Sequence, residues 1–304
     1  MKEFAPIILF VYNRLKNTRE TVDHLLANSE AAGSDLFVFS DAPKNESAGS
    51  SVNAVREYLH KLSGFRSVTI IEREDNYGLV RNIVSGVSDI VGKYGKAIVL
   101  EDDLSVSPFF LKYMNEALER FEDRDDIACI HGYVYPHRKQ LPEVFLVKGA
   151  DCWGWATWKR AWSLFSLDAG SLYRRIQEEG LQHEFDFSST YPYMKMLERQ
   201  ANGEAASWAV CWYASAFLAG KYTVYPDQSM VAINSLSDGG THDSPSPYMK
   251  LFTTDVKMAP IDWEKGSLDG ESMEARKEFE SFFNSLKSLK VKIHSKLRKL
   301  FKKR

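Results

Sequence analysis

The stretch "AIVLEDDLSV", residues 97–106, places three carboxylates, Glu101, Asp102 and Asp103, directly after four apolar residues. The apolar run predicts a buried strand, so the carboxylates stand at its carboxyl end. Like charges this close repel one another, and the repulsion is costly at a partly buried strand end. A divalent cation such as Mg2+ or Mn2+ would remove it, because these ions prefer oxygen ligands. A solvated acidic loop is the alternative interpretation.

Strands and helices alternate around this stretch. Apolar runs predict strands at 6–13, 35–41, 67–74, 96–100 and 127–134. Apolar residues at helical spacing predict helices at 18–29, 51–62, 77–94 and 107–121, the first with Thr18 as its N-cap. Such alternation is typical of an α/β fold with a mostly parallel sheet and helices on both faces.

Polar residues end the predicted strands, and we expect them to share one crevice, because parallel sheets bind ligands at the carboxyl ends of their strands. Besides the three acids, they are Tyr12, Asn13 and Arg14, then Asp41, then Glu72, Arg73 and Glu74. The chain has no GxGxxG after its first strand and no GxxxxGK[ST], so the dinucleotide-binding and P-loop signatures are absent.

After about residue 135 the alternation stops and aromatic residues gather. Four tryptophans lie in "GADCWGWATWKRAWSLF" (149–165), and two more in "SWAVCWYASAFLAGKYTVYPD" (207–227). We expect this region to be rich in loops and shaped around a ligand. Helical spacing predicts that Trp158 and Trp162 pack in the core.

The charge of the chain is unevenly placed. The formal net charge is −2, but the segment from Ser281 onward holds nine cations and no acid, which leaves the first 280 residues at −11. The apolar stripe of this segment predicts a helix on an anionic membrane surface; packing on the acidic body is the alternative. An acidic body excludes nucleic acid as a partner.

No run of apolar residues is long enough to predict a membrane-spanning helix. The three cysteines, Cys129, Cys152 and Cys211, are interpreted as buried thiols of a reducing compartment. The predicted location is therefore the cytoplasm, with peripheral attachment of the basic segment to the inner face of the cytoplasmic membrane.

Several segments, in order, resemble glycosyltransferases of the GT-A fold, in the style of the N-acetylglucosaminyltransferase I group and of bacterial family-2-like enzymes. They are "FVYNR", "VFSDAP", "DNYGLVRNIVSGV", "VLEDDLSVSPFFLKYMNEAL", "CWGWATWKRAW" and "YPDQSMVAINSLSDGGTHD", which together cover roughly residues 6–243. The resemblance implies a metal-dependent, inverting enzyme that transfers a sugar from a nucleoside diphosphate sugar, a UDP-sugar being favoured. The acceptor would be a glycan or a lipid-linked saccharide.

The resemblance also implies roles for individual residues. The donor-binding set is Tyr12, Asn13, Arg14, Asp41, Arg81, Asn82, Glu101 and Asp102. Asp103 and His242 would hold the Mn2+ or Mg2+ ion. Trp153, Gly154 and Trp155 would bind the acceptor, because sugar rings stack on indoles. In this scheme residues 1–134 bind the nucleotide sugar, 135–265 form the acceptor side, and 266–304 form the basic C-terminal helix.

The catalytic base is the point at which the chain departs from the family pattern. Related enzymes carry an acid near the segment that corresponds to "SWAVCW", but no acid lies between Ala205 and Phe217. Glu204 is the first candidate and Asp151 the second. Two alternatives stay open: a sugar nucleotidyltransferase, whose usual glycine-rich first loop is missing here, and a catalytically inactive sugar-binding protein.

Overall fold

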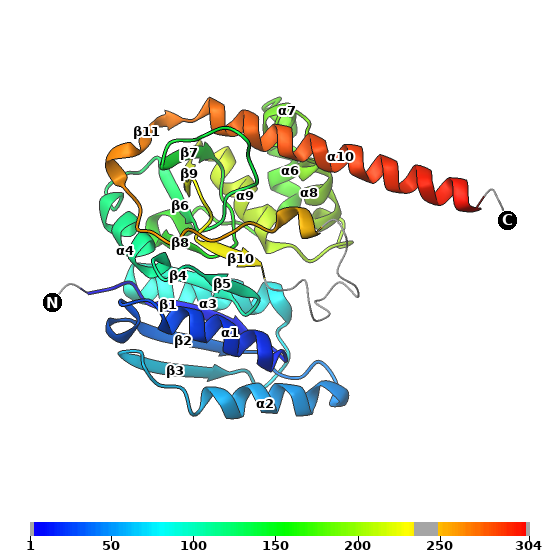
Figure 1. Ribbon diagram of the computed structural model, residues 1–304. Coiled ribbons are helices and arrows are strands. Elements are labelled where there is room, and N and C mark those ends of the chain that lie inside the picture. The colour runs from blue at the N-terminus through cyan, green and yellow to red at the C-terminus, as the bar shows by residue number, and fades with distance from the viewer. Residues whose placement is uncertain (1–2, 234–248, 302–304) are drawn as a thin grey trace.

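The structure, a computed structural model, describes residues 3–233 and 249–301, with the backbone alone from residue 288 onward. One nine-stranded sheet runs through the molecule in the order β11-β7-β9-β6-β8-β4-β1-β2-β3 (Figure 1). Its strands are β1 (Ile7–Val11), β2 (Asp35–Ser40), β3 (Ser67–Glu72), β4 (Lys96–Glu101), β6 (Ile127–His131), β7 (Val144–Lys148), β8 (Trp155–Trp158), β9 (Tyr222–Pro226) and β11 (Ser267–Glu271). Five of the eight neighbouring pairs are parallel, which confirms the predicted α/β fold.

The first half contains the predicted helices with small shifts of their ends. They are α1 (Leu15–Leu26), α2 (Gly49–Leu59), α3 (Gly78–Tyr94) and α4 (Phe110–Arg120). The prediction of Thr18 as an N-cap is wrong, because α1 begins at Leu15 with Arg14 in the capping position. Thr18 is instead a buried residue inside the helix, and its hydroxyl donates to the backbone oxygen of Arg14.

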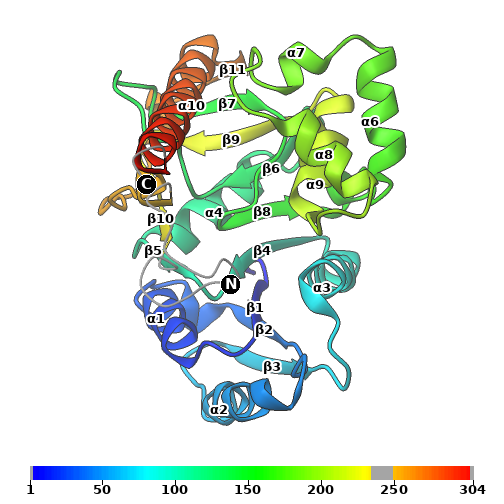
Figure 2. The same ribbon diagram turned by 90° about the vertical axis from the view of Figure 1, so that its right-hand side faces the viewer.

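Helices cover both faces of the sheet (Figure 2). Ile7, Leu9 and Val11 of β1 belong to the apolar cluster that includes α1 and α4. Ile8 and Phe10 belong to the cluster that includes α3. Side chains of a strand alternate between its two faces, so β1 is buried on both.

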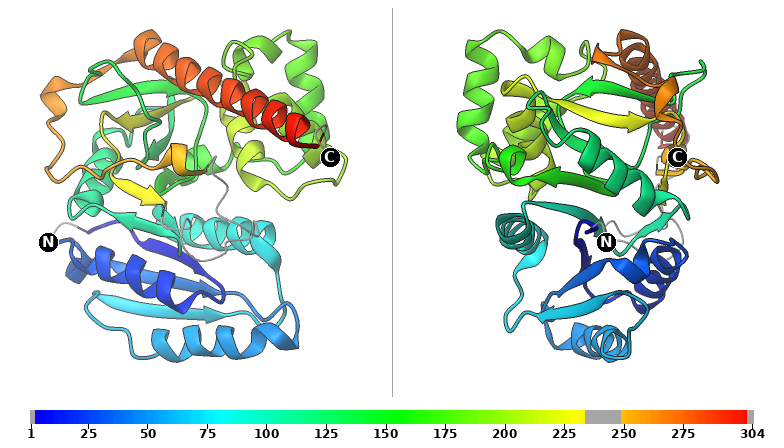
Figure 3. Two further views of the ribbon diagram at one scale, coloured as in Figure 1. Left: turned by 45° about the vertical axis from the view of Figure 1, so that its right-hand side comes forward. Right: turned by 90° about the vertical axis from the view of Figure 1, so that its left-hand side faces the viewer.

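The second half is not the loop-rich region that we expected. After residue 135 the chain adds four strands of the large sheet, β7, β8, β9 and β11, and five short helices. The helices are α5 (Lys159–Trp162), α6 (Ala169–Glu178), α7 (Gln182–Phe185), α8 (Tyr193–Ala201) and α9 (Trp208–Leu218). The blue to cyan first half and the green to yellow second half occupy opposite ends of the molecule (Figure 3). Trp158 and Trp162 are buried, as predicted, although Trp158 lies in β8.

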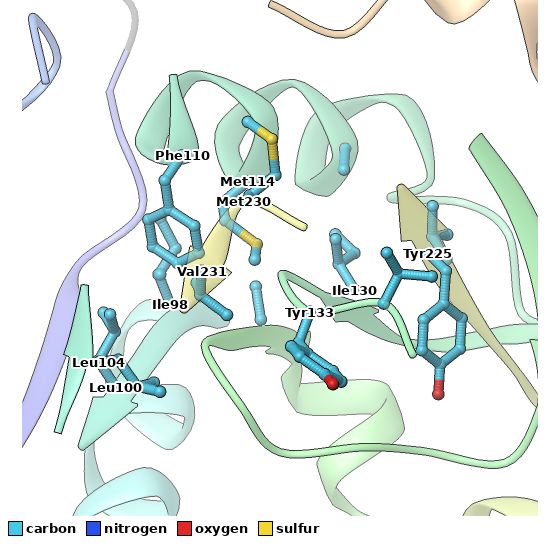
Figure 4. Packing of buried hydrophobic residues seen from close by; sticks show 14 of the residues in the cluster. Ile98, Leu100, Leu104, Phe110, Met114, Ile130, Tyr133, Tyr225, Met230 and Val231 are labelled. Carbon is cyan, nitrogen blue, oxygen red and sulfur yellow. The ribbon is translucent and has the colours of Figure 1, made fainter. Parts of the chain in front are cut away.

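A two-stranded sheet that the sequence did not reveal follows the three carboxylates. In it β5 (Leu104–Val106) pairs antiparallel with β10 (Val231–Ile233). Figure 4 shows Phe110 and Met114 of α4 packed near Met230 and Val231, within one apolar cluster. This packing fixes β5, and the turn formed by residues 102 and 103 therefore lies between two anchored strands.

The last helix, α10 (Met273–Phe301), has two parts. Its first part packs on the body through Phe279, Phe283 and Leu286, which are at most 2% exposed. Its second part extends away from the body (Figure 1). Packing on the body, the alternative left open by the sequence, therefore holds as far as Leu286. Across the described ranges, no helix is both long and apolar enough to cross a membrane.

Candidate active site

The three carboxylates meet Arg14 at the carboxyl end of β4, as the strand order predicts. Asp102 is 3% exposed, and its Oδ1 accepts a hydrogen bond of 2.6 Å from Nη2 of Arg14. Its Oδ2 accepts a bond of 3.2 Å from the hydroxyl of Thr18. The Asp103 side chain is 27% exposed and lies 3.5 Å from the same guanidinium. Asp102 is thus paired inside the protein, whereas Asp103 is open to a ligand.

One guanidinium does not neutralise three carboxylates. Burial, followed by the charges of Asp103 and Asp102, raises the pKa of Glu101 to about 8. Burial also raises the pKa of Asp102, against the lowering effect of Arg14. Ionising all three acids is therefore costly here unless a further positive charge is bound beside the accessible Asp103. These residues fit a divalent cation, for which oxygen ligands and a surplus of negative charge are suitable.

The protein ligands in the described part of the chain are few. Residues 3–233 and 249–301 contain no group of three or more His, Cys, Asp or Glu side chains placed to hold a metal ion. His242, the second predicted ligand, lies outside the described residues. Of the two predicted metal ligands, Asp103 is therefore the one whose position the structure describes.

Asp41 holds the loop that begins α3. One carboxylate oxygen accepts the N–H of Tyr77 at 2.8 Å and the other accepts the N–H of Gly78 at 2.8 Å. Asn76 donates a third bond, of 3.3 Å. A carboxylate at a helix N-terminus also interacts favourably with the helix dipole. Asp41 thus anchors this loop beside the end of β2, and its contact with the nucleotide stays a prediction.

Two arginines stack on the ring of Tyr77 beside this loop. The Arg81 guanidinium lies 3.6 Å from the ring centroid, and that of Arg73 lies 4.5 Å from it. Arg81 is exposed, so it can reach a ligand in the crevice. Asn82 is 4% exposed and accepts a bond of 3.0 Å from Nε of Arg73, so it orients that arginine.

The remaining predicted donor residues follow β1. The hydroxyl of Tyr12 accepts the N–H of Lys44 at 3.0 Å, which joins the ends of β1 and β2. Asn13 is half-buried between Tyr12 and Arg14. Together with Arg14, these residues place polar groups along the edge of the sheet that carries the acids.

A second concave region, the aromatic pocket, lies at the start of β8. It is a cavity of about 180 Å3 lined mainly by aromatic rings. The rings belong to Tyr135, Trp153, Tyr191, Tyr193, Tyr213 and Phe252. Asp151 also lines it, so the aromatic pocket brings together one candidate base and one candidate sugar-stacking residue.

Tyrosine hydroxyls orient the carboxylate of Asp151. Its Oδ2 accepts a bond of 2.8 Å from Tyr135 and one of 3.3 Å from Tyr225. Its Oδ1 accepts the N–H of Cys152 at 2.9 Å. A carboxylate can accept about four hydrogen bonds, so Oδ1 keeps a free lone pair for a ligand.

The aromatic pocket adjoins the acids of β4. Strand β8 pairs antiparallel with β4 and sets Trp155 opposite Val99, so the residues before β8 run toward the carboxyl end of β4. Burial raises the pKa of Cys152 well above its usual value, and the charges of Asp151, Glu101 and Asp103 raise it further. Cys152 is therefore near enough to both the base candidate and the acidic cluster for their charges to raise its pKa.

Residues 7–143 match the model of glycosyl transferase family 2. The match covers β1 to β6 and all of the acids of β4, and it confirms the predicted enzyme class, a glycosyltransferase, for this part of the chain. The match ends at residue 143 and therefore does not include Asp151. No curated protein matches the chain.

Solved structures show a distant likeness. A mannosyltransferase from Pyrobaculum calidifontis, PcManGT, in complex with GDP-Man and Mn2+, is 13% identical with a TM-score of 0.34, and the match covers 44% of this chain and 36% of that one. Residues 1–349 of S. aureus TarS are 10% identical with a TM-score of 0.41, over 76% of this chain and 60% of that one. A second TarS structure is 15% identical with a TM-score of 0.31, over 47% and 24%. The matched regions thus span less than two thirds of each of these proteins.

The prediction of Trp155 as a sugar-binding residue is wrong in this structure. Trp155 is 1% exposed and packs against other tryptophans, Trp162 and Trp208 among them. Gly154 has φ +60°, and a Cβ there would lie 2.7 Å from Val231, so this glycine allows a close backbone approach. Trp153 alone of the three faces the aromatic pocket, where it contacts Tyr133 and Phe252 edge-on.

Glu204, the first choice as base, lies on the surface. Its side chain is 58% exposed, and its carboxylate lies 3.7 Å from Nε of Arg199. It does not line the aromatic pocket. The geometry therefore favours Asp151 over Glu204 as the base.

The sequence reasoning missed Tyr135, Tyr225 and His131. His131 ends β6, Tyr225 lies near the end of the parallel strand β9, and Tyr135 follows β6 closely. The rule that placed Arg14 and the acids, polar residues at the carboxyl ends of parallel strands, could have identified all three. Burial lowers the pKa of His131, whose Nε2 accepts the N–H of Trp153 at 2.9 Å, so it supports the aromatic pocket as a neutral imidazole.

Proposed function

We propose that this protein is an inverting glycosyltransferase that moves a sugar from a nucleoside diphosphate sugar to a saccharide acceptor. The donor would lie along the carboxyl ends of β1 to β4, and the acceptor would occupy the aromatic pocket. A UDP-sugar is our first choice of donor, and the finer likeness to the N-acetylglucosaminyltransferase I group belongs to this proposal. The observation that carries it is the pairing of β8 with β4, which sets Trp155 opposite Val99 and so directs the segment with Asp151 toward the acids that follow β4.

On the donor side, the chain supplies charge and fixed positions. Arg14 pairs with Asp102 and keeps the turn of residues 102 and 103 in place, so Asp103 points out of that pairing. Arg81, stacked on Tyr77, is available to a diphosphate oxygen. Asp103, with His242, would hold a divalent cation, which when bound supplies the positive charge that stabilises a leaving diphosphate.

On the acceptor side, Asp151 serves as the general base. The acceptor hydroxyl oxygen attacks the anomeric carbon of the donor, and the bond from that carbon to the diphosphate oxygen breaks. The electron pair of that bond leaves with the diphosphate, and the hydroxyl proton passes to Oδ1 of Asp151. Hydrogen bonds from Tyr135 and Tyr225 hold Oδ2, so the carboxylate turns Oδ1 toward the acceptor.

Binding and turnover of UDP-, GDP- and dTDP-sugars, with and without Mn2+, test the proposal. We expect metal-dependent binding and slow hydrolysis of at least one donor. Asp151→Asn should keep donor binding and lose transfer, whereas Glu204→Gln, the matched control, should keep both. Absence of metal-dependent binding with every donor would refute the transferase reading. Binding without any turnover or transfer would instead favour an inactive sugar-binding protein.

We also infer that the far part of α10 attaches the enzyme to an anionic membrane surface, on its cytoplasmic side. After Lys287 the chain carries eight cations and no acid. Each cation near an anionic surface contributes about 1 kcal/mol, so several suffice for reversible attachment. A lipid-linked saccharide would then lie close to the enzyme.

A further inference from the structure

We propose that the sugar ring accepted in the aromatic pocket carries no negative charge, so that uronic acids and phosphorylated or sulfated sugars are rejected there. This inference rests on the proposed function, because it names the acceptor class of that same site.

The lining offers an anion no counter-charge. Among the described residues that line the pocket, Asp151 is the one charged side chain, and none is a lysine, arginine or histidine. The others are aromatic rings and small or apolar side chains, such as Met196 and Val210. Burying an unpaired carboxylate or phosphate against such a surface costs several kcal/mol.

The hydroxyl groups that line the pocket are largely committed within the protein. The hydroxyl of Tyr135 donates to Oδ2 of Asp151 at 2.8 Å. The hydroxyl of Tyr213 donates to the backbone oxygen of Phe185 at 2.9 Å. An anion needs donors, whereas Asp151 presents an acceptor, which suits the hydroxyl group of a neutral sugar.

The surrounding charge also disfavours an anion. Asp151 itself lines the pocket, and its segment leads into β8, which pairs with the acid-bearing strand β4. An anionic substituent on the acceptor would thus lie close to a carboxylate of the same sign.

The size of the pocket limits what enters it. A cavity of about 180 Å3 has room for roughly six water molecules at about 30 Å3 each. The volume of one sugar ring is of this order, whereas the volume of several linked rings is larger. The ring would pack an apolar face on Trp153, with the reacting hydroxyl toward Oδ1 of Asp151.

Matched pairs of methyl glycosides test this inference on the full chain. The neutral members are the methyl glycosides of glucose, galactose and mannose. The partner of each is the methyl glycoside of the uronic acid with the same ring configuration. Binding is measured without donor by saturation-transfer NMR, and transfer is measured with donor and Mn2+. We expect the neutral member to bind and react roughly tenfold better or more in each responding pair. Equal or better binding of the uronic acids would overturn the inference, as would the absence of binding by every sugar.

A charge substitution provides a second readout. Met196 of α8 lines the pocket, whereas Met194 of the same helix does not. Met196→Arg should reduce the preference for neutral rings several-fold, and Met194→Arg should leave it unchanged. Failure of donor binding refutes the proposed function, and an unchanged preference in Met196→Arg refutes this inference alone.

Discussion

Arg14 contacts two of the three acids at the end of β4, and it contacts them unequally. Its guanidinium is 2.6 Å from Asp102 but 3.5 Å from Asp103. Asp102 also accepts a bond from Thr18 and is almost fully buried. We therefore expect Asp102 to act mainly in stability and Asp103 mainly in binding.

Asp103→Ala should abolish metal-dependent donor binding and leave the fold intact, because the accessible carboxylate is lost and the Arg14–Asp102 pair remains. Titration calorimetry with donor and Mn2+ measures the binding, and circular dichroism the fold. Asp125→Ala, at another exposed acid, is the control and should behave like the wild type. Donor binding by Asp103→Ala at wild-type strength would place the metal elsewhere.

Asp102→Ala should lower the free energy of unfolding by about 3 kcal/mol, because it leaves Arg14 and Thr18 without their buried acceptor. Urea unfolding measures this change. Asp103→Ala is the matched control here and should change stability by less than about 1 kcal/mol. Equal losses in the two variants would contradict the division of roles.

Tyr135→Phe should reduce transfer about tenfold and leave donor binding unchanged, because Asp151 loses the shorter of its two tyrosine hydrogen bonds. Tyr213→Phe is the control within the same pocket, since its hydroxyl bonds to Phe185 and not to Asp151. Steady-state transfer rates at saturating donor distinguish the two. A loss in Tyr213→Phe as large as that in Tyr135→Phe would argue for a merely structural effect.

Single residues were predictable where strand order alone decides their place. The acids and Arg14 met because they end neighbouring parallel strands. The sequence spacing could not show that Trp155 is buried while Trp153 lines the pocket. Residues two positions apart in a strand are expected on the same face. The positive φ of Gly154 breaks the strand between them, and a sequence does not reveal that turn.

Elements were predictable in the first half and less so in the second. Apart from β5, the strands up to β6 alternate with helices along the chain, so local periodicity identifies them. Strands β7, β8 and β9 are four or five residues long and pair with distant segments; β7, for example, pairs with β9 across the helical region. Their pairing depends on tertiary contacts, which local patterns do not contain.

Helix α10 packs directly against the aromatic pocket. Phe279 and Phe283 pack edge-on against Tyr135, with ring centroids 5.0 and 4.9 Å from it. Phe283→Ala should therefore lower the free energy of unfolding by about 3–5 kcal/mol. Met273→Ala, at a 55% exposed position of the same helix, should change it by less than about 0.5 kcal/mol. Urea unfolding checks both, and a small change in Phe283→Ala would show that α10 is not part of the core.

At the scale of the whole molecule, the basic tail can be removed without loss of stability only beyond the buried residues of α10. Ending the chain after Lys287 keeps Phe283 and Leu286 in the core and removes eight cations. This variant should no longer sediment with anionic phosphatidylglycerol vesicles, and its donor hydrolysis should stay unchanged. Ending the chain before Ser281 should destabilise the protein as well. If the full chain does not bind anionic vesicles in preference to phosphatidylcholine, the membrane proposal fails.

Strand β8 has a mechanical consequence for the whole enzyme. It pairs with β4 on one side and with β6 on the other, so the two halves share one continuous sheet. The end of β4 and the aromatic pocket are thus joined through a continuous hydrogen-bonded ladder. A shift of β8 by one residue would move the preceding segment, which carries Asp151, by about 3.3 Å along β4. The hydrogen-bond register of a single four-residue strand thus sets how far Asp151 lies from the acids at the end of β4.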